Sequence, residues 1–496
     1  MKTMKNNYRQ EKINTQILVI GSGAGGAVTA ATLAKAGYSV VILEEGERID
    51  TNTLETHSTE AMKLLYRNRG MTPIFGNTTI AYVEGCCVGG STEINSAFWH
   101  RTPEDCINRW TEKYKVKDLS KDSLYKLFNE VEKDLTIQYS DPKSISRSSS
   151  LLKKGAEELN WSIQEIPRAQ IKIENSQFAP GAKSSMSRTF IPAAIEHGVK
   201  ILSNSKAIKI NHGNGRVTSV LAVSSDKDSK TMLTIEAEHV FISGGAVQTP
   251  TLLLKSNINK NIGQSIFIHP MLKIAAMFEE SLDSHKDPIP IYQIKEFMPD
   301  ITIGGSVFTP GFLSMLFCDN WTLNATAMEK WQNMALYYAG ITGKGIGRIR
   351  LFPFTNEPFI SYRLSKEDQS NLSKGLAYIS KLLFKSGAKK LFPAVRNLPF
   401  LETQNESDYF LNNVIPFQSM SLSTVHAFSS CPMGEDEDIC AVNSFGKTYG
   451  FENLYISDAS IIPDAPGVNP QGTIMALALR NAKYFLETKR GGELCQ

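Results

Sequence analysis

A glycine-rich segment near the N-terminus has the residue types and spacing of a dinucleotide-binding loop. The sequence Gly21-Ser-Gly23-Ala-Gly-Gly26 fits the pattern GxGxxG. In such a loop the first glycine permits a tight turn after a strand, the second lets the backbone approach a pyrophosphate, and the third lets the next helix pack close to the sheet. The N-terminus of that helix supplies N–H donors and a positive dipole. The chemistry expected here is the binding of a phosphate-bearing molecule.

The GxGxxG pattern alone is weak evidence for a bound dinucleotide, because a glycine-rich turn without a ligand shows the same pattern. The segments on either side of the loop provide the stronger evidence. Gln16–Ile20 is a short apolar run typical of a buried parallel strand, and Val28–Ala36 is an Ala-rich helix that ends at Gly37. A second buried strand, Ser39–Leu43, leads into Glu44, an acid at the position where ribose hydroxyls would lie. Together these segments form a β-α-β unit and predict a bound dinucleotide.

The course of the chain after this unit indicates which dinucleotide it binds. An NAD enzyme usually continues with further β-α-β units, whereas this chain leaves for irregular sequence and returns to a buried strand at His239–Ile242. FAD proteins commonly make such a long excursion, because distant segments supply the walls around the flavin. The sequence therefore predicts FAD.

Later segments extend the pattern beyond the first loop. They are Gly85–Asn95, Gly245–Pro250 followed by Leu252, Leu253 and Ser256, and near the C-terminus His426–Gly434, Leu454–Ser460 and Asn469–Thr473. With Ile20–Gly26 and Leu43–Gly46, and in this order, they resemble the motifs of the glucose-methanol-choline (GMC) oxidoreductase family. The resemblance implies an FAD-dependent enzyme that oxidises an alcohol to a carbonyl by hydride transfer to flavin N5.

The resemblance places the catalytic residues of the family on His426 and Asn469. Imidazole titrates near neutrality, so His426 is expected to take the hydroxyl proton as the hydride leaves. The Asn469 amide is expected to fix the pose of the substrate oxygen rather than to transfer a proton. A lone histidine is more often a buried structural residue, and the flanking motifs are what favour catalysis.

The resemblance also implies which residues contact the cofactor. Backbone N–H groups of the second glycine loop are expected to line the isoalloxazine, and the dipole of the terminal helix is expected to face the reduced ring. For Asn95 a loop or cap role is the alternative, and for Asp458 a helix N-cap. The predicted cofactor-binding residues are Gly21, Gly23, Gly26, Glu44, Gly89, Gly90, Ser91, Asn95, Ala207, Asp458, Pro470 and Thr473. Some family members attach the flavin to a histidine where this chain has Ile94, so we expect non-covalent FAD.

The composition argues against several other classes of protein. The 496 residues include 53 Lys+Arg and 50 Asp+Glu, a net charge of +3, which gives no basic excess for nucleic acid. Seven cysteines at no repeating spacing and eight scattered histidines indicate neither a disulfide framework nor a metal site. No apolar run reaches the roughly 18 residues of a membrane span, and polar residues 1–15 do not resemble a secretory signal. We expect a cytoplasmic protein that binds no nucleic acid, metal or membrane, and its oligomeric state stays open.

The strand and helix patterns divide the chain into two domains. Residues 1–265 and 420–496 are predicted to form a discontinuous, Rossmann-like FAD-binding domain of the α/β class. Residues 266–419 are predicted to form a substrate domain with a mostly antiparallel sheet and helices, and a contribution from 105–200 is left open.

Local patterns in the second half predict individual elements. Ile346–Phe352 and Phe359–Leu364 are expected to form a hairpin, followed by an amphipathic helix over Lys366–Lys385. The chain is expected to end in a helix over Thr473–Leu486.

The substrate is the least readable feature of the sequence. The motifs also resemble the bacterial branch of the family that oxidises the primary hydroxyl of aminoglycoside sugars such as paromamine, in antibiotic biosynthesis. A cationic aminosugar would favour carboxylates at the pocket, and Glu93, Glu435 and Asp436 are near the motifs in sequence. A long-chain alcohol, polyol or sterol would leave the same motifs intact.

Two other classes of function remain open, as does the electron acceptor. One is an FAD-containing lyase of the hydroxynitrile type, which carries out no net redox reaction. The other is a nucleotide-binding module without catalysis, although the presence of His426 disfavours it. The reduced flavin would pass its electrons to O2 or to another acceptor, and the sequence does not distinguish them.

Overall fold

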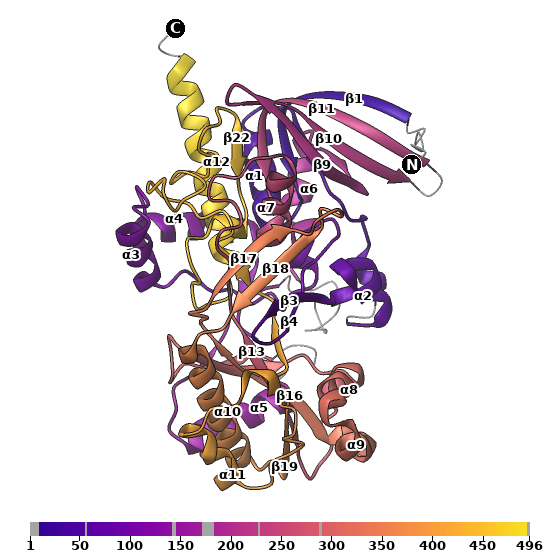
Figure 1. Cartoon of the computed structure of the whole chain (residues 1–496), viewed down its shortest axis with the longest axis vertical. Helices are drawn as coiled ribbons and strands as arrows, with labels where there is room; N and C mark the ends of the chain where they lie inside the picture. The colour runs from indigo at the N-terminus through magenta and orange to yellow at the C-terminus, as the bar shows by residue number, and fades with distance from the viewer. Residues whose placement is uncertain are drawn as a thin grey trace.

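The computed structural model describes residues 9–54, 57–140, 145–170, 183–226, 229–286 and 290–493. It places two sheets in opposite halves of an elongated molecule (Figure 1). The hairpin of β17 (Ile346–Leu351) and β18 (Pro358–Arg363), at one end of the strand order of the second sheet, lies near the middle of the molecule.

The first sheet is built on the predicted β-α-β unit. Its central strands β1 (Arg9–Ile20) and β11 (Ser229–Ile242) run parallel, and β2 (Val40–Leu43) lies parallel on the other side of β1. The strands that complete it are β8 (Lys200–Leu202), β9 (Ser205–Gly213), β10 (Arg216–Asp226) and β22 (Leu454–Ile456). Residues 17–20 of β1 and all of β2 are buried, as expected for parallel strands covered on both faces.

Helices from distant parts of the sequence cover this sheet. They are α1 (Ala24–Lys35), α6 (Phe190–Glu196), α7 (Gly245–Lys255) and α12 (Gln471–Glu493), and α4 (Lys121–Val131) packs on α12. The terminal helix begins two residues earlier and continues seven residues further than the sequence predicts. It lies beside α1 (Figure 1). The helices that follow the first and the last sequence motif are therefore neighbours in the structure.

Glycines allow these segments to approach closely around the end of β1. A Cβ atom on Gly26 would lie 2.0 Å from the carbonyl oxygen of Gly21, and one on Gly25 would lie 1.8 Å from that of Ser457. Gly21 has a φ of +102°, and a Cβ atom there would lie 2.3 Å from the carbonyl oxygen of Ser243. The loops after β1, β11 and β22 therefore converge on backbone that a side chain would push apart.

The second sheet is mostly antiparallel, as predicted. Its strand order is β17-β18-β3-β4-β20-β13-β16-β15-β14-β6, with β19 beside β13. The remaining strands are β3 (Thr72–Gly76), β4 (Ile80–Tyr82), β6 (Ile163–Glu165), β13 (Met271–Met277), β14 (Tyr292–Ile294), β15 (Ile301–Ser306), β16 (Met334–Ile341), β19 (Lys390–Pro393) and β20 (Leu422–Thr424). Strands β3, β4, β6 and β20 come from outside residues 266–419, and the domain limits themselves stay a prediction.

The hairpin and the long helix of this half form where the sequence predicts them. β17 pairs antiparallel with β18, and α10 (Lys366–Ser386) begins at a capping box formed by Ser365 and Asp368. A Cβ atom on Gly375 of α10 would lie 3.0 Å from Cβ of Ala339 on β16. Because side chains alternate along a strand, Tyr338 and Gly340 face the other side of the sheet, away from α10.

Shorter elements complete the described chain. They are α2 (Thr59–Leu65), α3 (Glu104–Lys113), α5 (Arg147–Glu158), α8 (Pro310–Phe317), α9 (Trp321–Asn324), α11 (Gln404–Asp408), β5 (Ile137–Gln138), β7 (Arg168–Ala169), β12 (Phe267–Ile268) and β21 (Ala427–Phe428). Among the residues that the structure describes, no helix has both the length and the apolar character needed to cross a bilayer.

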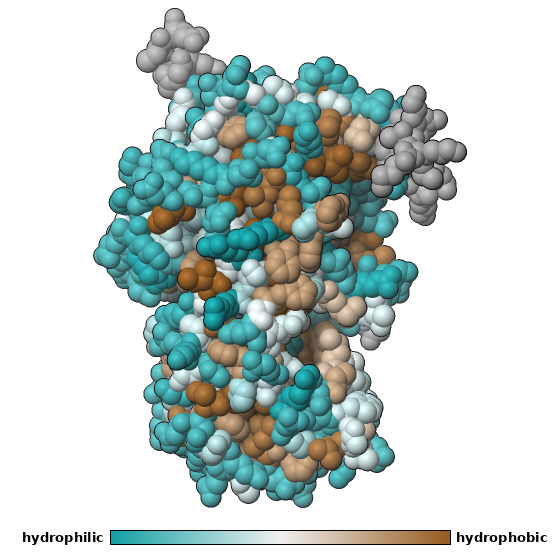
Figure 2. All heavy atoms as spheres, in the orientation of Figure 1, coloured by the Kyte–Doolittle hydropathy of each residue, from teal (hydrophilic) through white to brown (hydrophobic). Residues whose placement is uncertain are grey.

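Apolar side chains gather on the surface over the hairpin (Figure 2). Phe75 of β3, Ile346 of β17, and Phe352 and Phe354 of the turn are all exposed. An apolar patch of this kind is typical of an interaction surface.

We predict that Gly26→Ala destabilises the protein by about 1–3 kcal/mol or more, because the new methyl group meets the carbonyl oxygen of Gly21. The matched control is Gly213→Ala at the end of β9, where a Cβ atom would meet nothing within 4 Å. That variant should stay within about 0.5 kcal/mol of wild type in urea unfolding followed by circular dichroism. Equal stability of the two variants would contradict the close packing described here.

Candidate active site

A cavity of about 630 Å³ connects the glycine loop after β1 with the histidine after β20. Its size lies within the range of about 300–1,000 Å³ that is usual for small-molecule sites. Both sheets contribute to its wall. The predicted site residues that line it are Gly21, Gly23, Glu44, Gly90, Ser91, Asn95, Ala207, His426, Asp458, Asn469 and Pro470.

The end of the cavity at α1 has the features of a phosphate site. A Cβ atom on Gly23 would meet nothing within 4 Å, so the backbone is open to a ligand there. The first turn of α1 carries no acidic residue that would repel an anion. This opening fits the pyrophosphate of a dinucleotide.

Glu44 is held at the end of β2 by its neighbours. Its carboxylate accepts hydrogen bonds from the N–H (3.0 Å) and O–H (2.7 Å) groups of Ser22 and from the N–H group of Gly46 (2.9 Å). Burial raises the pKa of Glu44, and these hydrogen bonds oppose that rise. The carboxylate lines the cavity with its position fixed, which fits the predicted contact with ribose hydroxyls.

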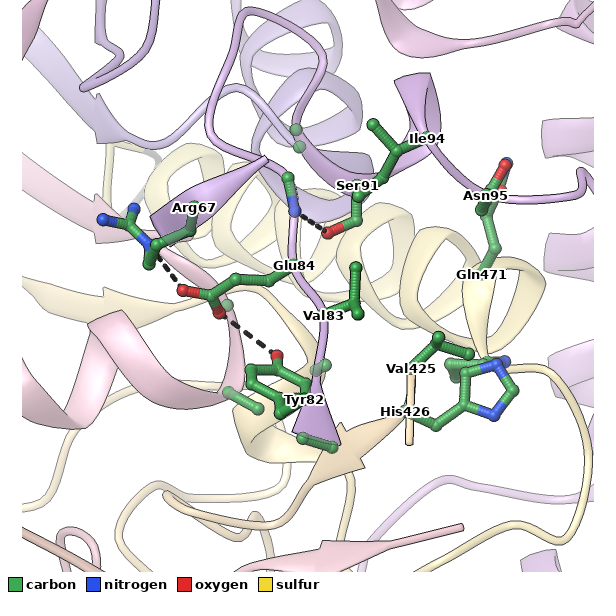
Figure 3. A pocket seen from close by; sticks show the side chains of 18 of the residues that line it. Arg67, Tyr82, Val83, Glu84, Ser91, Ile94, Asn95, Val425, His426 and Gln471 are labelled. Atoms are coloured by element: carbon green, nitrogen blue, oxygen red, sulfur yellow. Dashed lines mark hydrogen bonds and ion pairs between the residues drawn. The ribbon is translucent and has the colours of Figure 1, made fainter. Parts of the chain in front are cut away.

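The second glycine loop packs directly on the first. The N–H group of Gly89 donates to Ser22 Oγ (3.0 Å), and a Cβ atom on Gly90 would lie 2.9 Å from Cα of Gly23. Ser91 Oγ accepts from the N–H group of Gly85 (3.0 Å), so its side chain braces the loop (Figure 3). The two loops thus form one continuous wall.

The side chains of Asn95 and of Gln471, the first residue of α12, contact each other in the cavity wall. Asn95 Nδ2 donates to Gln471 Oε1 (2.6 Å), and Asn95 Oδ1 accepts from the N–H group of Ala97 (3.0 Å). Figure 3 shows Asn95 and Gln471 close together, with Ile94 on the same segment as Asn95 and His426 beyond them. Ile94 offers no nucleophilic atom for attachment of a cofactor.

Asp458 anchors two loops at the carboxyl ends of β11 and β22. It accepts from Gly245 N–H (2.8 Å), from Thr249 O–H (2.5 Å), and from the N–H (2.8 Å) and O–H (2.5 Å) groups of Ser460. Its side chain therefore caps the short helical turn that follows, which is the alternative role considered for it, and it also lines the cavity.

His426 stands between two side chains that can each donate or accept. Its Nδ1 lies 3.1 Å from Nδ1 of His269, and its Nε2 lies 3.2 Å from Nδ2 of Asn469. The N–H group of Gly467 points at Nε2 of His269 (3.3 Å). Burial lowers the pKa of His426 to about 4 and lowers that of His269 well below its usual value, so both rings are neutral near pH 7.

Three predicted cofactor residues lie behind the cavity wall. Gly26 is where α1 packs on the loop, and Gly89 has a φ of +97°, with a Cβ atom only 2.1 Å from Oε1 of Glu93. Thr473 is fully buried, and its hydroxyl lies 2.9 Å from that of Thr102. They shape the wall from behind, and the cavity does not reach their atoms.

The cavity also contains residues that the sequence analysis did not identify. They include His57, His269, Lys273 and Gln471. The histidines stand in segments without a recognisable motif. Lys273 interrupts the apolar run Met271–Met277, and a charge on a buried strand is the one sequence signal that pointed to it.

The described residues show no metal centre. Within them, no three or more His, Cys, Asp or Glu side chains come together in a way that would hold a metal ion.

Family comparisons agree with this geometry. Residues 15–271 match the N-terminal family model of GMC oxidoreductases, and residues 347–478 match the C-terminal one. The chain belongs to the GMC oxidoreductase family. It is therefore an FAD-dependent oxidoreductase, and the predictions of family, fold class and cofactor are confirmed.

Individual relatives of this GMC oxidoreductase differ in how much is known of them. It is 37% identical to an uncharacterised GMC-type oxidoreductase of Sinorhizobium fredii, over 96% of this chain and 95% of that protein. It is 26% identical to the long-chain-alcohol oxidase FAO4A of Arabidopsis thaliana, over 94% of this chain and 68% of that protein. The crystal structure of pyridoxine 4-oxidase from Mesorbium loti has the same fold, with a TM-score of 0.71 at 15% identity, covering 96% of this chain and 99% of that one.

The lowered pKa of His426 predicts the pH dependence of any step in which it acts as a base. The neutral form is present above its pKa of about 4, so the rate of flavin reduction should be constant from about pH 6 to pH 8 and fall as the pH approaches 4. Stopped-flow reduction at saturating alcohol measures this. A rise in rate centred near pH 6.5, the ordinary value for histidine, would contradict a buried neutral His426.

Proposed function

We propose that this GMC oxidoreductase oxidises an alcohol to a carbonyl, with His426 as the general base and Asn469 as the residue that positions the hydroxyl. The observation that carries the proposal is the placement of His426 and Asn469 side by side, 3.2 Å apart, in the cavity that also contains the dinucleotide loop. The proton acceptor must reach the hydroxyl oxygen while the hydride acceptor faces the C–H bond of the carbon that carries this hydroxyl, and a shared cavity allows both.

The residues present fit FAD, which supplies the hydride-accepting flavin N5 when bound. The loop at Gly21 and Gly23 with the N-terminus of α1 would hold the pyrophosphate, Glu44 the ribose, and the backbone at Ala207 the adenine. Gly90, Ser91 and Asn95 would hold the ring system, and the N-terminus of α12 after Pro470 would face it with its positive dipole. With Ile94 at the attachment position, the cofactor would be non-covalent.

His269 controls which nitrogen of His426 is free. If Gly467 donates to Nε2 of His269, the His269 proton is on Nδ1 and points at Nδ1 of His426. A base-competent His426 needs the reverse arrangement, with its own proton on Nδ1 and a lone pair on Nε2. Asn469 Nδ2, 3.2 Å from Nε2 of His426, can only donate, so this contact fits the base-competent arrangement, and the other arrangement would need the amide to present Oδ1 instead. A hydroxyl arriving at Nε2 would draw the pair into the catalytic arrangement.

The cavity wall supports an alcohol with an apolar body. Phe312, Met315 and Leu316 of α8 line it, and relatives of this chain include long-chain-alcohol oxidases. The electron acceptor is proposed to be O2 or another small oxidant. A small-molecule alcohol and such an acceptor are the partners that this function requires.

An aminosugar substrate, the finer hypothesis from the sequence, has less support. Glu435 and Asp436 pair with Lys117 (3.2 Å) and Lys115 (3.0 Å) away from the cavity. The Glu93 carboxylate accepts from the backbone N–H of Ser187 (3.3 Å) instead of lining the site. The carboxylates expected for a cationic sugar are therefore directed elsewhere.

Anaerobic mixing with alcohols distinguishes oxidation from a lyase reaction. Loss of the flavin absorbance band on adding 1-decanol or a related primary alcohol, with recovery in air, is the expected result. A flavin that keeps its absorbance with sugars, polyols and aliphatic alcohols alike would favour the hydroxynitrile-type lyase reading.

We predict that His426→Ala slows flavin reduction by about 10²–10⁴-fold while FAD stays bound, because the hydroxyl proton loses its acceptor. Stopped-flow spectrophotometry of the anaerobic holoenzyme gives the rate, and the flavin spectrum gives the occupancy. The control is His197→Ala, which changes an exposed histidine outside the cavity and should leave both unchanged. Near-wild-type reduction in the His426 variant would refute its role as the base.

A further inference from the structure

The cavity wall contains a lysine without a counter-ion. Lys273 lies on β13 and lines the cavity, and its Nζ lies 5.6 Å from the centre of the Phe312 ring. Among the described residues its Nζ has no hydrogen bond or salt bridge to a side chain or backbone atom. Burial alone lowers its pKa, without any contribution from a neighbouring carboxylate.

The other cations of the wall are all paired. Arg67 lies 2.8 Å from Glu45 and also contacts Glu84 at 2.5 Å, Lys206 lies 2.8 Å from Glu45, and Lys255 lies 4.0 Å from Glu357. A buried charge is normally paired, since an uncompensated one is costly. Lys273 therefore differs from its counterparts in the described wall in a way that calls for an external anion.

The carboxylates of the described wall are not available to it. Glu44, Glu45, Glu84 and Asp458 already accept hydrogen bonds or salt bridges from protein donors. None of them stands on the strands β13 to β16 that carry Lys273 and its neighbours.

The sheet around Lys273 leaves the ammonium group facing open space. Tyr338 pairs with Lys273 across the sheet, but its ring leans the other way, over Gly304, where a Cβ atom would lie 2.8 Å from the Tyr338 hydroxyl oxygen. There the hydroxyl accepts from Gln293 Nε2 (3.0 Å), and Gln293 Oε1 accepts from Lys295 Nζ (2.8 Å). The neighbouring polar side chains Tyr338, Gln293 and Lys295 thus bond to one another, and none of them bonds to Lys273 Nζ.

The sheet also relates the position of Lys273 to the positions of His269 and His426. Met271 at the start of β13 pairs with Ser423 of β20. The segment that joins His269 to β13 therefore runs alongside the segment that joins β20 to His426. Lys273 and His269 are four residues apart, roughly 13 Å along an extended chain. A substrate whose hydroxyl meets His426 would therefore reach Lys273 with its far end.

We propose that the substrate carries a carboxylate at the end opposite its reacting hydroxyl, and that Lys273 binds it. A carboxylate fits better than a phosphate, because a single ammonium balances one negative charge and no arginine fork is present in this part of the described wall. With the apolar residues of α8 between the two ends, the class indicated is the hydroxyalkanoic acids. This inference rests on the proposed alcohol oxidation.

Matched pairs of substrates test the proposal. Each ω-hydroxyalkanoate from 4-hydroxybutanoate to 12-hydroxydodecanoate is compared with the α,ω-diol of the same length in anaerobic flavin reduction by the holoenzyme. We expect at least one acid to reduce the flavin about tenfold or more faster than its diol at low concentration. In Lys273→Met the advantage should disappear while the rate with the diol is unchanged, and Lys273→Arg should retain part of it.

The matched control is Lys295→Met, which removes a second partly buried lysine of the same sheet that does not line the cavity. It should keep the preference for acids. Diols that reduce the wild-type flavin as well as the acids do, or a Lys273→Met variant that loses acids and diols equally, would overturn the proposal. In both cases the proposed oxidation of alcohols would still stand.

A binding measurement separates the two proposals if no compound reduces the flavin. Decanoate, which has no hydroxyl to oxidise, is titrated into the holoenzyme by calorimetry. We expect binding to wild type and to Lys295→Met, weakened about tenfold or more in Lys273→Met. Absence of binding to wild type, or equal affinities in all variants, would overturn the carboxylate site independently of catalysis.

Discussion

The close approach of three backbone loops at the end of β1 is the constraint on which the cofactor half of this enzyme depends. Gly21, Gly25 and Gly26 bring the loop after β1 against the segments that follow β11 and β22, at distances that no side chain would permit. These segments are more than 200 residues apart in the chain. α1 begins within this contact, and the N-termini of α1 and α12 both border the cavity.

The electrostatics of the cavity divide along the same line as the two sheets. In the cofactor half the charged groups are matched, with Arg67 and Lys206 on Glu45 and with Asp458 surrounded by donors. In the other half the histidines are neutral and the Lys273 ammonium has no protein partner among the described residues. Because an unpaired buried charge costs free energy, this difference favours a ligand as the partner of the Lys273 ammonium.

The position of His426, the proposed base, depends on strands from both ends of the second sheet's sequence. His426 follows β20, which pairs with β13 and β4, whereas His269 precedes β13. Their rings meet because β13 and β20 run antiparallel, so a slip of one register step would separate them. The contact between His426 and His269 therefore depends on the correct pairing of β13 with β20.

The sequence by itself determined the cofactor fold and its chemistry, because those depend on local patterns. The glycine spacing, the flanking apolar strands and Glu44 lie within one β-α-β unit, and the hairpin and α10 follow from turn and periodicity signals close in the chain. The tertiary structure alone decided which other residues line the cavity with His426. His269, Gln471 and Lys273 stand in segments distant from it, and Lys273 looks like an isolated polar residue until the sheet turns it toward the cavity. Glu93 shows the converse, since its closeness in sequence to the flavin loop did not bring its carboxylate into the cavity wall. Which charges are paired is a property of non-local packing, and sequence periodicity carries no information about it.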